Sequence, residues 1–139
     1  MIAQADVSKF DPHNCVQVSE NKDLNDYALN MKSLYEQKNY SALLDLTKEI
    51  IRKYAQSAQE MQASLSKYPK RKPALSMGEL NLVSLAFYWQ AIANHELNQP
   101  EKAQYSTQKL TEVYYYGQCL TEKRVIIKPV EALKTQGNK

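Results

Sequence analysis

The chain has 139 residues, of which 43% are hydrophobic and 24% are charged, and its formal net charge is +3. This length gives room for one domain with one core, and three Gly and five Pro are too few for a turn-rich β-sandwich. The charges alternate in sign along most of the chain, so the mild basic excess does not predict a nucleic-acid surface. We therefore expect a single helical domain, residues 1–139, that does not bind nucleic acid.

Residues 1–22 lack the apolar stripe of a helix and contain Pro12, so they are expected to form an extended arm. Ala3 and Ala5 have the A-x-A spacing that signal peptidases read, but no charged and apolar regions precede them. One interpretation is that Met1 to Ala5 are the remains of a signal peptide behind a new start methionine. The other is that so short a pattern matches by chance.

The chain has two cysteines, Cys15 and Cys119, near its opposite ends. An even number of cysteines favours one disulfide in an exported protein. Such a bridge closes a loop of about 100 residues and is worth about 4 to 5 kcal/mol in the chain-entropy model. The pair thus predicts a periplasmic or secreted protein. The alternative is a cytoplasmic protein with two free thiols.

Two helices are predicted next along the chain, at about 23–37 and 40–68. Asp23 is a candidate N-cap for the first. In the second, apolar residues recur at alternating spacings of four and three, and the helix ends at Tyr68 because the next residue is proline. Beyond Tyr54 this stripe becomes thinner, so the second half of the helix is expected to project past the core or to meet a partner, including a second copy of the chain.

The one dense basic cluster follows this helix, and it is the predicted partner-binding site. It could anchor an acidic surface of another protein, and the alternative is a loop that is simply solvated by its charge. The residues assigned to partner binding are Lys67, Lys70, Arg71 and Lys72, with the neighbouring Tyr68 and the later Tyr115.

The third predicted helix, about 77–97, has apolar side chains on nearly all its faces, which is typical of a helix buried at the centre of a domain. Ser76 and Glu79 have the spacing of a capping box at its start. Asn81, Ser84, Gln90 and Asn94 interrupt the apolar run, so no membrane insertion is expected. This helix should be the one around which the others pack.

The fourth predicted helix spans about 100–117. Pro100 suits its first position and Gly117 its end. The run from Tyr114 to Tyr116 places aromatic rings on three faces of the last turn, so at least one of them should be exposed or cover another segment. Residues 120–139 are expected to form an extended tail that packs back on the helices.

The two predicted hairpins, 24–68 and 79–117, can be superposed with an offset of 60 residues. In the second, Ala91 and Ala103 lie twelve positions apart on either side of a short turn. This hairpin, mainly residues 84–117, resembles a tetratricopeptide repeat. The resemblance implies antiparallel helix pairs and a function in peptide or protein binding.

The chain shows no pattern of residues typical of catalysis. His95-Glu96 begins a helical metal-binding motif, but Gln99 stands where its second histidine would be needed, and His13 and His95 cannot complete a zinc site with the cysteines. His95 is expected to be a partly buried side chain with a hydrogen-bond partner. We expect neither a cofactor nor a metal.

The sequence therefore predicts a non-catalytic, exported protein-binding domain. A concrete form is a periplasmic inhibitor, such as an immunity protein that protects against a toxin enzyme, because that role suits a small domain held by a disulfide. The alternatives are an adaptor or chaperone subunit of an envelope or secretion assembly, an enzyme with an unrecognised site near His95, and a homodimer formed through the end of the long helix.

Overall fold

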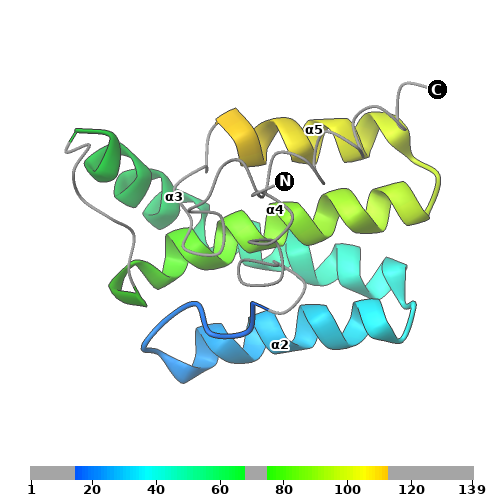
Figure 1. Ribbon diagram of the computed structural model, residues 1–139, viewed down its shortest axis with the longest axis horizontal. Coiled ribbons are helices and arrows are strands. Elements are labelled where there is room, and N and C mark those ends of the chain that lie inside the picture. Colours follow the sequence, from blue (N-terminus) through cyan, green and yellow to red (C-terminus); the bar gives the residue numbers. More distant parts are fainter. Residues whose placement is uncertain (1–14, 68–74, 113–139) are drawn as a thin grey trace, which may run out of the picture.

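The structure is a computed structural model that describes residues 15–67 and 75–112, and within these ranges it is all-α (Figure 1). The predicted four-helix architecture is confirmed, and the bounds agree to within one residue wherever a helix end is described. Residues 1–14, 68–74 and 113–139 lie outside the described residues, and with them most of the predicted arm, the end of the fourth helix and the tail. The elements are α2 (Lys22–Glu36), α3 (Tyr40–Lys67), the short 3-10 helix η2 (Leu75–Met77), α4 (Gly78–Glu96) and α5 (Pro100–Glu112).

Helix α4 is the central element, as its apolar sequence predicts. Figure 1 shows it between α2 and α5, and it packs against α3 along much of its length. Every residue from Leu80 to Asn94 is buried, including the polar ones. Burial on all sides explains why this helix carries no single apolar stripe. Among the described residues, no helix combines the length and apolarity that a membrane crossing requires.

Helix α3 is covered by its neighbours over both halves. Leu43 and Ile50 are fully buried in the first half, and Ala58 and Leu65 are fully buried in the second. The expectation that the second half projects past the core is therefore wrong. The start of α4 lies alongside it, since Met61 of α3 and Met77 before α4 line the same surface cavity. The apolar stripe is thin in the second half of α3 because the space at one buried position, Ala58, fits only a small side chain.

The two helical hairpins turn in the same way. At the end of α2, the backbone N–H of Asn39 donates to the carbonyl of Leu34 at 2.9 Å; sixty residues later, Gln99 donates to Asn94 at 2.8 Å. In each turn the preceding residue, Lys38 or Asn98, has a positive φ of 58° or 59°. This is the hydrogen-bond pattern of a Schellman C-cap. The repeated turns match the offset of 60 that superposes the hairpins.

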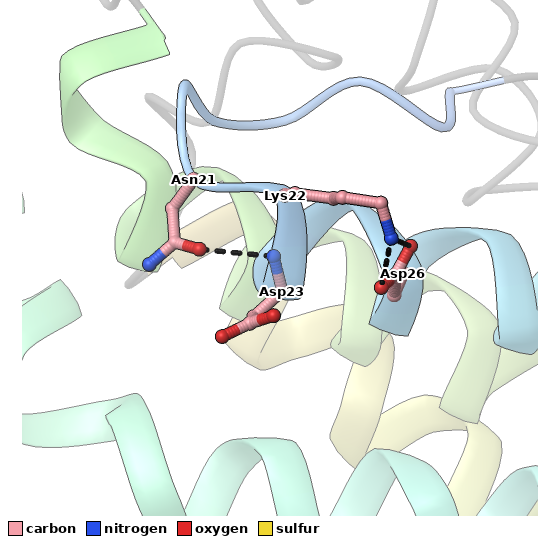
Figure 2. Close-up of polar contacts among 4 residues, drawn as sticks. All are labelled: Asn21, Lys22, Asp23 and Asp26. Atoms are coloured by element: carbon pink, nitrogen blue, oxygen red, sulfur yellow. Dashed lines mark hydrogen bonds and ion pairs between the residues drawn. The ribbon is translucent and has the colours of Figure 1, made fainter.

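The prediction that Asp23 caps the start of α2 is wrong, because Asn21 is the N-cap residue (Figure 2). The Asn21 side chain accepts a hydrogen bond of 2.9 Å from the backbone N–H of Asp23. At the start of α2, Lys22 and Asp26 form an exposed ion pair of 3.0 Å across one helical turn. The hydrogen bond to Asp26 raises the pKa of Lys22. Because both side chains face solvent, this pair adds little to stability.

Residues 15–21 form no helix and are held against the bundle by two asparagines. Asn25 accepts hydrogen bonds from the backbone N–H groups of Val18 at 2.8 Å and Ser19 at 3.0 Å, and it donates to the Ser19 carbonyl. Asn81 of α4 donates to the Val18 carbonyl at 2.8 Å. The described end of the arm is therefore fixed to α2 and α4 by polar contacts, with Val18 fully buried.

The predicted capping box at the start of α4 is wrong. Met77 occupies the N-cap position, and no side chain caps the helix there. Ser76 is exposed within η2, which runs directly into α4. Because the chain is already helical before Gly78, Ser76 lies inside a turn and not at its free end.

Candidate functional site

A groove between α3 and α5, with α4 as its floor, is the candidate site. Its volume is about 340 Å³, at the lower end of the range usual for ligand pockets. We call it the α3–α5 groove. It is lined by Leu44 and Lys48 of α3, Gln90 and Asn94 of α4, and Gln99, Glu101, Lys102, Tyr105 and Ser106 at and after the turn into α5.

The first polar residue on the floor, Gln90, ties three helices together. Its amide nitrogen donates to the Thr47 hydroxyl of α3 at 3.3 Å. Its amide oxygen accepts from the Ser106 hydroxyl of α5 at 2.8 Å. Thr47 and Ser106 are buried, so these hydrogen bonds form in a low-dielectric setting where they fix geometry. The walls and floor of the groove are thus held in one arrangement.

The second polar residue on the floor, Asn94, differs from Gln90 in its hydrogen bonding. It lies one turn after Gln90 on the same face of α4, and it is 4% exposed. Its side-chain oxygen is buried and has no hydrogen-bond partner among the described residues. A buried acceptor without a partner costs about 1 to 3 kcal/mol. Native structures contain few such groups, so the Asn94 amide is an unusual feature beneath the groove.

The rim of the groove is aromatic and carries charges of both signs. Tyr105 is 56% exposed, and the ammonium of Lys109 lies 5.6 Å from the centre of its ring. Lys48, Glu101 and Lys102 are exposed around the opening. An exposed tyrosine beside mixed charges is typical of protein-binding surfaces, because its ring supplies contact area at a low cost in side-chain entropy.

The partner-binding residues predicted from the sequence are not brought to this groove in the described part of the chain. Lys67 is exposed in the last turn of α3, and it is not a lining residue. The remaining members of that prediction, Tyr68, Lys70, Arg71, Lys72 and Tyr115, lie outside the described residues. Their role stays a prediction.

Cys15 is half-buried against the core. The other cysteine of the chain, Cys119, lies outside the described residues. The pairing of Cys15 with Cys119 therefore stays a prediction, as does the compartment inferred from it.

His95 is half-buried in the last turn of α4, as predicted, but its imidazole makes no hydrogen bond to any described residue. It follows Asn94 directly, and the turn of about 100° per residue in a helix directs it away from the groove. No described group of three histidine, cysteine or acidic side chains could hold a metal ion. The described surroundings of His95 thus offer it no visible acid–base partner.

Asn94 and Gln90 are the site residues that the sequence analysis missed. Both were interpreted only as interruptions of an apolar helix. The available signal was their spacing of four residues, which places two amides on one face of a helix that is otherwise apolar. Asn81 and Ser84 are polar residues of α4 with other roles, since Asn81 holds the arm and Ser84 donates to the Leu80 carbonyl at 2.8 Å.

Comparison of the chain with family models, with curated proteins and with solved structures finds no match.

Proposed function

We propose that this protein is a non-catalytic, exported protein-binding domain and that the α3–α5 groove is part of its binding surface. The observation that carries the proposal is the groove itself, a cavity of about 340 Å³ that side chains of three helices line beside the exposed ring of Tyr105.

The rigidity of the groove supports binding without a large change of shape. Gln90 joins α3, α4 and α5 through hydrogen bonds, so little side-chain ordering remains to be done when a partner docks. The resemblance of residues 84–117 to a tetratricopeptide hairpin, which stays a prediction, implies peptide or protein binding.

The concrete form that we favour is a periplasmic inhibitor, such as an immunity protein against a toxin enzyme. The predicted disulfide between Cys15 and Cys119 is the feature that favours export. An adaptor or chaperone subunit of an envelope or secretion assembly is the second form of the same proposal. Both predict a tight complex with one protein, and they differ in whether that protein is an enzyme that loses its activity in the complex.

Partner capture from envelope extracts tests the proposal. Two variants separate the surfaces: Asn94→Leu alters the groove, and the joint change of Lys70, Arg71 and Lys72 to glutamine alters the basic cluster. Loss of the captured protein with Asn94→Leu supports the groove, and loss with the triple variant supports the basic cluster. Capture that is unaffected by both changes would contradict the proposal as a whole.

The enzyme alternative near His95 predicts something different. A folded His95→Ala variant should then lose a turnover that the wild type shows, while partner capture is unchanged. Under the binding proposal, His95→Ala leaves capture unchanged and there is no turnover to lose.

A further inference from the structure

We propose that helix α5 opens from the rest of the domain as a separate unit, so that the α3–α5 groove forms only in the closed state. Residues of α5 make up one wall of the groove, and the groove is lost when this wall moves away. The role of the opening in binding rests on the proposed function, whereas the opening itself follows from how α5 is held.

Helix α5 brings little apolar surface into the core. Among its described side chains, the apolar ones that are buried are Ala103 and Leu110, each 1% exposed. Helix α2, on the other side of α4 (Figure 1), is of similar length, with 15 residues against 13. Because apolar burial offsets the entropy lost when residues are ordered, α2 is held more firmly than α5. The apolar residues that α2 places in or against the core are Leu24, Ala28 and Met31, with the half-buried Tyr27, Leu34 and Tyr35.

The rest of the buried face of α5 is polar, since Ser106 and Thr107 are 1% and 3% exposed. Small side chains such as Ala103 and Ser106 let α5 approach α4 closely, so the contact is close without being strongly apolar. The Ser106 hydroxyl donates to the Gln90 amide oxygen at 2.8 Å. This hydrogen bond fixes the geometry of the closed groove. Both groups bond to water when α5 opens, so the hydrogen bond adds little to the stability of the closed state.

The floor of the groove also favours opening. Asn94 lines the groove together with Lys102, Tyr105 and Ser106 of α5. While α5 is in place, the Asn94 side-chain oxygen is buried and has no hydrogen-bond partner among the described residues. Water reaches the Asn94 amide once α5 has moved away, and a hydrated acceptor no longer carries the cost of burial. This gain lowers the free energy needed to open α5.

The turn between α4 and α5 is suited to act as the hinge. The backbone N–H of Gln99 donates to the Asn94 carbonyl at 2.8 Å, and Asn98 has a positive φ of 59°, so α4 has its own C-cap and does not need α5 to end it. Pro100 begins α5 and has no backbone N–H to bond across the hinge. A partner in the groove would select the closed state, and its apparent affinity would fall in proportion to the closed fraction.

Hydrogen exchange of the full-length protein, measured by mass spectrometry, tests the opening. The amides of residues 104–112 are compared with those of residues 26–36 in α2, after correction for intrinsic exchange rates. We expect the α5 amides to exchange at least about tenfold faster. Low concentrations of urea should speed exchange in α2 and leave α5 unchanged, because a local opening exposes less surface than unfolding of the whole domain.

Two matched glycine substitutions at exposed positions test whether the helices open independently. Leu29→Gly weakens α2, and Gln108→Gly weakens α5. From the difference in helix propensity, each should speed exchange in its own helix about threefold. Leu29→Gly should leave exchange in α5 unchanged, because α2 stays folded when α5 opens.

Exchange in α5 that is no faster than in α2, or that depends on urea in the same way, would overturn the inference, because α5 would then open only with the whole domain. The same conclusion follows if Leu29→Gly speeds α5 as much as α2. These measurements involve no partner, so they leave the proposed function untouched. If partner capture is unaffected by changes in the groove, the proposed function fails and the opening of α5 stands.

Discussion

Replacing Asn94 by leucine should stabilise the protein, which is the reverse of what most substitutions of buried residues do. The two side chains have nearly the same shape, so the change leaves packing almost intact while it removes an acceptor that has no hydrogen-bond partner among the described residues. Such an acceptor costs about 1 to 3 kcal/mol, and the better helix propensity of leucine adds a few tenths of a kcal/mol. We expect the free energy of unfolding to rise by about 1 to 3 kcal/mol.

Urea denaturation followed by circular dichroism measures this gain, with an unchanged dependence on urea as the sign that the unfolded state is the same. Asn30→Leu, on the exposed face of α2, corrects for helix propensity. Gln90→Met is the opposite case: it removes the hydrogen bonds to Thr47 and Ser106 and should cost about 1 to 3 kcal/mol. An Asn94→Leu protein that is no more stable than the wild type, once the effect of Asn30→Leu is subtracted, would mean that the Asn94 oxygen has a hydrogen-bond partner. That result would refute the expected gain.

Three further predictions concern the arm and the surface. Gly78→Ala should destabilise the protein by about 1 to 3 kcal/mol, because an added Cβ would overlap the Ser19 side chain. The same urea denaturation measures this loss, and an unchanged midpoint would show that the arm is loosely held. Asn21→Ala should cost about 1 kcal/mol by loss of the N-cap, and a cost near zero would mean that another residue caps α2. The hydrogen bond from Lys53 to Tyr27 raises the pKa of Lys53 above 10.5. The stability that this hydrogen bond adds is therefore complete below pH 10.5 and is lost as the pH rises through the raised pKa. Unfolding midpoints measured across that range should show this loss for the wild type and not for Tyr27→Phe.

The helices could be predicted from the sequence because periodicity and breakers act locally. The apolar faces of α2 and α5, the proline at the start of α5 and the all-round apolarity of α4 each define an element without reference to the rest of the chain. The offset of 60 between the hairpins also reflects local chemistry, since Lys38 and Asn98 terminate their helices by the same turn.

The errors came from choices that depend on neighbours distant in the chain. Asn21 and Asp23 are both good capping residues, and the choice between them depends on how Ser19 and Val18 are held by Asn25 and by Asn81 on α4. The groove could not be predicted for the same reason. Gln90 and Asn94 are both amides on one face of α4. Only the packing of α3 and α5 determines that Gln90 has hydrogen-bond partners and that the Asn94 oxygen has none among the described residues.

Photo-crosslinking from the rim of the groove is the most direct test of the claim that this surface binds a protein. A photoreactive phenylalanine analogue is placed at Tyr105, or as a control at Leu29, which is similarly exposed on α2, and cells of the source organism are irradiated. If the α3–α5 groove binds a protein, position 105 gives one discrete adduct with another protein, this adduct is lost when Asn94→Leu is added, and position 29 gives no such adduct. Equal adducts from the two positions, or none from position 105, would show that the groove is not the binding surface.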